Sequence, residues 1–96
     1  MRLSRLQKYI LAEAHTARGK FDRERLMDFY REAKDPPSRK ESMDAVTKSL
    51  ERLIDHELMT GYGVRTPHKW YIKEVRLTPK GRKEAKRIRG EQQRLL

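Results

Sequence analysis

The 96-residue chain contains no cysteine, which excludes a disulfide framework and a thiolate metal site. It also lacks a long apolar run: Tyr9-Ile10-Leu11-Ala12 is too short for a signal-peptide core or a membrane span. Apolar residues make up 35% of the chain and charged residues 40%, which predicts one small core beneath a densely charged surface. We therefore expect one domain over residues 1–96 in a cytoplasmic protein that does not contact membranes.

Motifs of enzyme chemistry are missing as well. The sequence has no Gly-rich phosphate loop, no nucleophile elbow and no recognisable acid–base motif. Its three histidines, His15, His56 and His68, have no second ligand at metal-binding spacing. We expect no enzyme activity, no metal, no cofactor and no small-molecule ligand.

What the chain has in excess is positive charge, and this charge is unevenly placed. Residues 1–64 contain 13 Lys and Arg against 11 Asp and Glu, which gives a net charge of +2. Residues 65–96 contain 11 Lys and Arg against 3 Glu, which gives +8. A concentrated basic surface attracts polyanions, so the charge pattern predicts a nucleic-acid partner.

Capping signals predict two helices in the first third of the chain. Ser4 and Gln7 have the spacing of a capping box, which predicts a helix over about residues 5–17. Asp22 is a suitable N-cap for a second helix over about residues 22–34, which two consecutive prolines then end.

A third helix and a hairpin follow. Ser38 is a suitable N-cap for a helix over about residues 39–57, and the apolar period then changes to two, which predicts a β-hairpin over about 58–78. Gly61 and Gly63 indicate close backbone approach or a bulge in the first strand. The alternation of the return strand slips around Lys73 and Glu74, where we also expect a bulge.

The last helix has a sharp start. Thr78 is a good N-cap and Pro79 suits the first helical position, which predicts a helix over about residues 79–95. A short strand at Lys20-Phe21 would pair with the hairpin edge. The expected fold is α+β and mainly α, a winged helix-turn-helix with a three-helix core, a β-hairpin wing and a C-terminal helix.

The run AVTKSLERLIDHELMTGYG, followed by a hairpin and LTPKGR, resembles the small winged-helix transcriptional regulators of the PadR-like and MarR-like families. The resemblance covers roughly residues 5–90. It implies sequence-specific binding of double-stranded DNA, with helix 39–57 as the recognition helix toward the major groove and the wing on the minor groove or backbone. The matching residues are Leu50, Leu53, Leu58, Trp70, Tyr71, Leu77, Thr78 and Gly81.

Three groups of residues are predicted to contact DNA, because cations and hydroxyl groups bind phosphates and base edges. They are Arg39, Lys40, Thr47, Lys48 and Arg52 on the third helix; Arg65, Thr66, His68 and Lys69 at the wing tip; and Lys80, Arg82 and Lys83 on the fourth helix.

The same face of the third helix also carries acidic residues. Asp44 with Lys48, Lys48 with Glu51, and Arg52 with Asp55 have ion-pair spacing, which predicts a nearly self-neutralised helix. We therefore expect the wing and the fourth helix to supply most of the grip on DNA.

Several alternatives stay open at this point. Tyr62, Trp70 and Tyr71 could stack on unpaired bases, although we expect them to pack on the core. The chain could instead be an RNA-binding module or a protein-interaction winged helix within a larger assembly. A homodimer could form through the first helix and the stripe Gly81, Ala85, Ile88 and Leu95 of the C-terminal helix.

Overall fold

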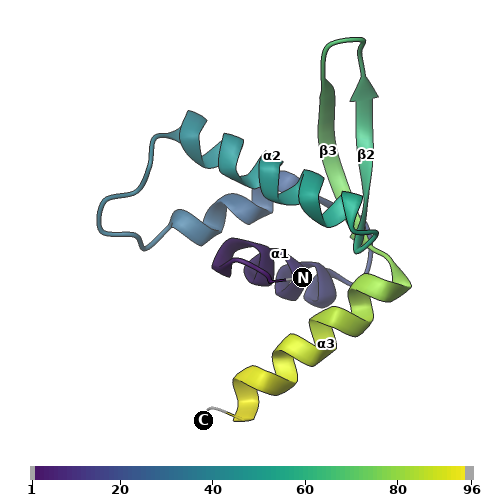
Figure 1. The fold of residues 1–96 in the computed structure, drawn as a ribbon. Helices are drawn as coiled ribbons and strands as arrows, with labels where there is room; N and C mark the ends of the chain where they lie inside the picture. Colours follow the sequence, from purple (N-terminus) through teal and green to yellow (C-terminus); the bar gives the residue numbers. More distant parts are fainter. Residues whose placement is uncertain (1, 95–96) are drawn as a thin grey trace.

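The computed structural model describes residues 2–94, and its fold is the predicted winged helix-turn-helix, mainly helical with one antiparallel sheet (Figure 1). No helix in this part of the chain is long and apolar enough to cross a membrane. In chain order, the elements are α1 (Arg5–Ala17), β1 (Phe21–Asp22), the 3₁₀ helix η1 (Arg23–Tyr30), α2 (Arg39–Asp55), β2 (Met59–Arg65), β3 (Trp70–Leu77) and α3 (Pro79–Arg94).

The predicted caps form at the starts of the three α-helices. At α1, the Ser4 hydroxyl accepts from the Gln7 N–H (3.1 Å) and the Gln7 side chain accepts from the Ser4 N–H (2.8 Å), a complete capping box. Ser38 caps α2. At α3, the Thr78 hydroxyl accepts from the Gly81 N–H at 3.0 Å. Local hydrogen bonds that the sequence encodes within four residues therefore decide where these helices begin.

The second helix differs from the prediction in type and length. The α-helix expected over about 22–34 is a 3₁₀ helix that ends at Tyr30, although Asp22 does cap it by accepting from the Glu24 N–H at 2.8 Å. Residues 31–38 are all exposed, so no apolar burial stabilises further helical turns there. Helix α2 also ends two residues earlier than expected, at Asp55.

The three strands pair antiparallel in the order β1-β3-β2. Strand β1 forms the edge strand expected near Lys20-Phe21, although it starts one residue later. In the hairpin, Tyr62 pairs with Glu74 but Gly63 pairs with Ile72, so Lys73 is an extra residue and the predicted bulge is confirmed. A Cβ at Gly63 would lie 1.9 Å from the Tyr71 carbonyl oxygen, which confirms the close backbone approach.

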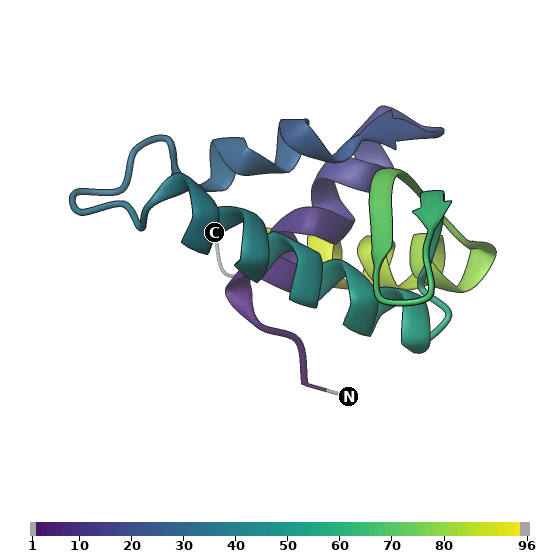
Figure 2. The same ribbon diagram turned by 90° about the horizontal axis from the view of Figure 1, so that it is seen from above.

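The core lies between the helices and one face of the sheet. Helices α2 and η1 run side by side with α1 beneath them, and α3 leaves the base of the sheet to pack against α1 (Figures 1 and 2). The fully buried side chains are Ile10, Leu11, Leu26, Val46, Leu50, Leu53 and Val75.

The stripe on α3 that we expected at a dimer interface is used inside the chain. Ala85 and Ile88 are only 4% and 3% exposed and belong to the core. A Cβ at Gly81 would lie 1.8 Å from the Leu58 carbonyl oxygen, so the backbone of Leu58 packs directly against α3 at this position. Leu95, the last member of the stripe, lies outside the described residues. The small apolar side chains of α3 therefore hold the helix against its own domain.

The hairpin aromatics divide between the two faces of the sheet. Trp70 packs against the core as predicted: its ring and Ile54 lie over Gly61, where a Cβ would be 2.9 Å from each side chain. The same expectation is wrong for Tyr62 and Tyr71, which are 36% and 55% exposed. They belong to the opposite face because the register places them on alternate positions from Gly61 and Trp70.

Candidate nucleic-acid interface

Helix α2 and the hairpin flank a hollow of about 390 Å³. Its helix side carries the acidic residues Glu51 and Asp55, whereas its hairpin side carries Arg65, His68 and Lys69. Ile54 and Trp70 contribute apolar groups to the same hollow. The two elements expected to contact a duplex thus lie on either side of one concave surface, with opposite charges facing each other.

A second hollow, of about 550 Å³, lies on the other flank of α2, against the start of α1. Lys48 and Arg52 of α2 line it together with Arg2 and the hydroxyl-bearing Ser4 and Ser49. This flank is basic, so the exposed side of α2 is divided into an acidic flank toward the wing and a basic flank toward the N-terminus. Such a cluster of cations is suited to a phosphate group.

The sequence reasoning missed Arg2. This arginine precedes the first helix, and no periodic pattern relates it to Lys48 and Arg52, which lie more than forty residues later. The only available signal was the capping box at Ser4, which fixes where the chain enters α1. Long-range packing of α1 against α2 brings the three cations together.

The predicted ion pairs along α2 are absent from the described residues. Asp44, Lys48, Glu51, Arg52 and Asp55 all point to solvent, and each remains available to a partner. The ion pairs that the described part of the chain forms are Lys20–Glu74, Arg25–Glu13, Arg39–Glu24, Arg87–Glu84 and Arg87–Glu91. The helix is balanced in charge, but its charges are not neutralised in contact.

Two other predicted contact residues of α2 are engaged within the protein. Arg39 forms an ion pair with Glu24 of η1 at 2.8 Å, which joins the start of α2 to the preceding helix. The Thr47 hydroxyl donates to the Met43 carbonyl (2.9 Å) and accepts from the Arg23 guanidinium (2.6 Å). Lys40, by contrast, is exposed at the first turn.

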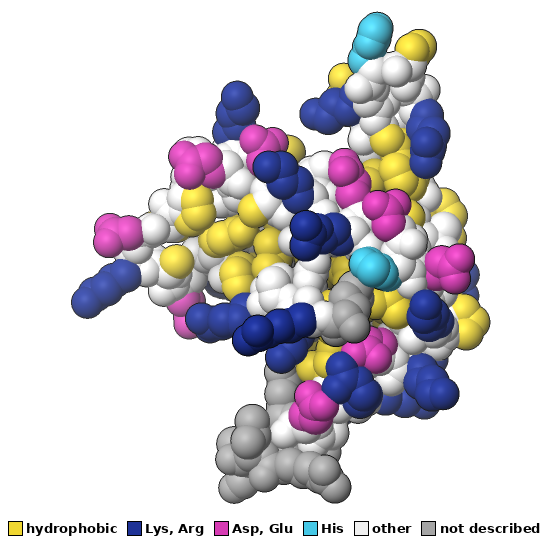
Figure 3. Space-filling model, in the orientation of Figure 1, with side chains coloured by type: hydrophobic (Ala, Val, Ile, Leu, Met, Phe, Trp, Pro, Cys, Tyr) yellow, Lys and Arg dark blue, Asp and Glu magenta, His cyan; other side chains and the backbone are white. Residues whose placement is uncertain are grey.

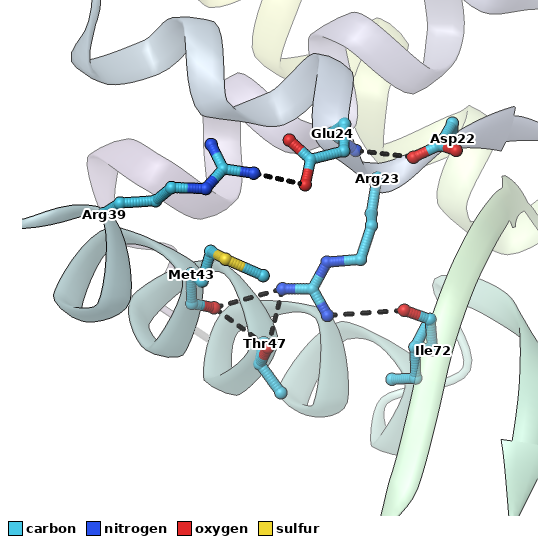
Figure 4. Close-up of polar contacts among 7 residues, drawn as sticks. All are labelled: Asp22, Arg23, Glu24, Arg39, Met43, Thr47 and Ile72. Carbon is cyan, nitrogen blue, oxygen red and sulfur yellow. Dashed lines mark hydrogen bonds and ion pairs between the residues drawn. The ribbon is translucent and has the colours of Figure 1, made fainter.

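Arg23 links the three elements that position the interface (Figure 4). Its guanidinium donates to the Met43 carbonyl (3.0 Å) and the Thr47 hydroxyl of α2, and to the Ile72 carbonyl of β3 (3.4 Å). Burial lowers the pKa of Arg23, an effect that the nearby carboxylate of Glu24 opposes. An arginine stays protonated nonetheless, so this contact is a charged clamp that sets the angle between α2 and the wing.

The wing tip, residues 65–69, is closed by Thr66. Its hydroxyl accepts from the Lys69 N–H (3.0 Å) and donates to the Lys69 carbonyl (2.9 Å), so Thr66 holds the turn that presents its neighbours. The Arg65 guanidinium lies 4.2 Å from the centre of the Trp70 ring, a cation–π contact that orients the arginine. In Figure 3, basic and acidic side chains are mixed over the helices, while the tip shows Lys, Arg and His and no acidic group.

The structure does not bring Lys80, Arg82 and Lys83 to the hollow between α2 and the wing. They begin α3 at the base of the sheet, at the end of the hairpin away from its tip (Figure 1). The Lys80 ammonium donates to the His56 carbonyl at the end of α2 (3.2 Å). Arg82 lines a separate hollow beside Tyr62 and Arg76. Within the predicted set, the wing tip and α2 therefore form one surface and α3 forms another.

Guanidinium, ammonium and hydroxyl groups are presented to solvent, and the described residues contain no group of three or more His, Asp or Glu placed to hold a metal ion. Cations at the wing tip and on the far flank of α2 form two separated basic patches, which are suited to an extended polyanion.

Comparisons with solved structures support the description of the fold. A mutant of ZitR from Lactococcus lactis matches with a TM-score of 0.67 and 19% identity, over 99% of this chain and 56% of that one. The adhesin competence repressor AdcR from Streptococcus pyogenes matches with 0.66 and 15%, over 98% and 59%. A MarR mutant from E. coli, complexed with operator DNA, matches with 0.61 and 16%, over 92% and 54%.

This likeness establishes the winged helix-turn-helix fold. The chain spans only a little more than half the length of these structures. No protein-family model matches the sequence, and no curated protein matches it.

Proposed function

We propose that this protein binds double-stranded DNA sequence-specifically as a small transcriptional regulator. The observation that carries the proposal is the placement of α2 and the basic wing tip on either side of one hollow. In this arrangement α2 enters the major groove, while Arg65 and Lys69 contact the adjacent minor groove or backbone. The MarR structure complexed with operator DNA has the same fold, which supports this reading.

The basic flank of α2 supplies a second anchor in this proposal. Lys48, Arg52 and Arg2 hold a phosphate on the side of α2 away from the wing, so a duplex is bound at two separated points. Between these points, the carboxylates of Asp44, Glu51 and Asp55 accept from cytosine amino groups and repel phosphates. The acidic flank therefore selects the sequence, and the cations supply the affinity.

A symmetric dimer would let the protein read two half-sites. Because Ala85 and Ile88 are buried within the chain, the interface would have to use the solvent-exposed sides of α1 and α3 instead. Sedimentation equilibrium of the chain with and without duplex DNA measures the assembly directly, and a monomer in both conditions would contradict the dimer.

Selection of bound duplexes from a random pool tests the proposal. A defined consensus is expected, and a palindromic one would support the dimer. Glu51→Gln with Asp55→Asn should blur the preference, whereas Lys69→Ala should weaken binding to all sequences alike. Competition with duplex RNA separates DNA binding from an RNA-binding role, since A-form RNA does not admit a helix to its major groove. Failure to bind any duplex DNA at low salt would overturn the proposal and favour a role in a protein assembly.

A further inference from the structure

The outer face of the wing sheet, on the side away from the core, carries an unusual set of residues. The register pairs Thr60 with Arg76, Tyr62 with Glu74 and Val64 with Tyr71 on this face. Tyr62, Val64 and Tyr71 are the large apolar side chains that the described part of the chain leaves exposed, at 36%, 66% and 55%. The proposed duplex contacts use the tip and the inner side of the hairpin, so this face has no role in them.

Cations accompany both tyrosine rings. The Lys20 ammonium lies 4.9 Å from the centre of the Tyr62 ring, and the Lys69 ammonium lies 5.2 Å from the centre of the Tyr71 ring. Glu74 is the acidic residue among the six outer-face residues, and Lys20 partly neutralises it at 3.9 Å. Exposed pairs of this kind contribute little stability, so both lysines can move to another anion at small cost.

A hollow of about 420 Å³ continues this face toward α3. Tyr62, Thr60 and Thr78 line it together with two guanidinium groups, those of Arg76 and Arg82. An aromatic ring, hydroxyl groups and paired arginines are the groups that contact a nucleotide, through its base, sugar and phosphate.

We propose that the outer face of the wing binds a single strand of nucleic acid, with unpaired bases stacked on Tyr71 and Tyr62 and a third nucleotide in the hollow. Tyr62 and Tyr71 are diagonal neighbours across the hairpin, which places their side chains roughly 7–8 Å apart. Lys69, Lys20, Arg76 and Arg82 then lie along the path of the phosphates. Stacking is tolerant of sequence, because every base has an aromatic face.

Charge and composition favour this occupant over the others. A second copy of the chain would bring together two surfaces of a protein with a net charge of +10. A lipid bilayer needs a wider apolar surface than three side chains set among cations. A duplex keeps its bases stacked inside and offers no ring faces to Tyr62 or Tyr71. The two proposed sites share Lys69 but otherwise use different residues, so the loss of a tyrosine ring removes no proposed duplex contact.

Fluorescence anisotropy of labelled oligothymidine and oligouridine with the full chain tests the proposal. Both strands should bind, and the stronger of the two identifies DNA or RNA as the source. Tyr71→Ala and Tyr62→Ala should each weaken binding about tenfold. Tyr71→Phe and Tyr62→Phe keep the rings and should keep the affinity. Val64→Ala removes exposed apolar surface without removing a ring, and should have little effect.

Duplex binding, measured in parallel, keeps the two proposals separate. The tyrosine variants should retain their affinity for duplex DNA and their circular-dichroism spectra. If the chain binds duplex but neither single strand, or if Tyr→Ala variants bind single strands as the unmodified chain does, the single-strand site is overturned while duplex binding stands. Tyrosine-dependent binding to phosphatidylserine vesicles that displaces the oligonucleotides would overturn it in favour of a membrane.

Discussion

Helix α2 and the wing hairpin flank the same hollow, yet they differ in charge and in how they are held. Helix α2 carries four cations and four acidic groups, whereas residues 59–77 of the hairpin carry four cations and one acidic group. The helix buries Val46, Leu50 and Leu53 along its length, while the wing tip projects beyond the core. Helix α2, which the core holds along its length, is therefore suited to reading a base sequence. The projecting wing tip is suited to binding phosphate groups.

Gly63→Ala should have the largest effect on stability, because it disrupts the pairing of the two hairpin strands. Its Cβ would lie 1.9 Å from the Tyr71 carbonyl oxygen, which no rotamer can relieve. We expect the free energy of unfolding to fall by about 3 kcal/mol. Urea denaturation measures this change. Gly90→Ala in α3 is the matched control: a Cβ there meets nothing within 4 Å, so it should stabilise the protein by about 0.5–1 kcal/mol. Equal effects at the two glycines would contradict the close approach.

Arg23→Met tests the contact through which Arg23 joins helix α2 to strand β3 of the wing. It removes the hydrogen bonds to Met43, Thr47 and Ile72, and we expect the free energy of unfolding to fall by about 2 kcal/mol. Arg25→Met removes a neighbouring arginine that makes an exposed ion pair with Glu13, and it should cost less than about 1 kcal/mol. Thermal unfolding of both variants measures the two losses of stability. The clamp is not needed if the two behave alike.

Neutralising the cations of the wing tip should lower the affinity for duplex DNA without changing the sequence preference. For Arg65→Gln with Lys69→Gln, we expect duplex affinity to fall about tenfold and the slope of log affinity against log salt to fall by about 2, since each phosphate contact adds about 0.9. A salt titration by fluorescence anisotropy measures both. Lys8→Gln with Lys34→Gln removes the same charge from exposed positions elsewhere. If this control loses as much affinity, net charge rather than the tip binds DNA.

The smallest effect is expected from the acidic flank of α2. Glu51→Gln with Asp55→Asn removes repulsion from phosphates beside the hollow, and should raise duplex affinity by about 1 kcal/mol or less at low salt. Sequence preference should become broader at the same time. Glu32→Gln with Asp35→Asn makes the same charge change in the exposed 31–38 loop. A gain in affinity from the loop pair equal to that from the helix pair would show that position does not matter.

The parts of this molecule that could be predicted from the sequence depend on short-range interactions. The capping box of Ser4, the start of α3 at Thr78 and the bulge at Lys73 each follow from a few neighbouring residues. The winged-helix order followed from the same signals and from the resemblance to known regulators.

What could not be predicted depends on residues that are distant in the chain. The contact between Arg23 and Ile72 joins positions 49 apart, and the cluster of Arg2 with Arg52 forms only when α1 packs on α2. The exposure of Tyr62 and Tyr71 depends on the strand register and on which face meets the helices. The prediction of ion pairs along α2 was wrong. Suitable spacing permits an ion pair, but solvated partners gain little by forming it.

The bulge at Lys73 separates the base of the hairpin, which the core holds, from an end in which Ile72 and Trp70 still contact the core and the tip lies beyond it. Residues 64–69 are all exposed, so substitutions among them, apart from Thr66 that closes the turn, should change the free energy of folding very little. Over evolutionary time, such a segment can exchange its side chains while the scaffold stays intact. A change of target can then be reached through a series of stable proteins, and the same segment is the natural place for a designer to graft new contacts.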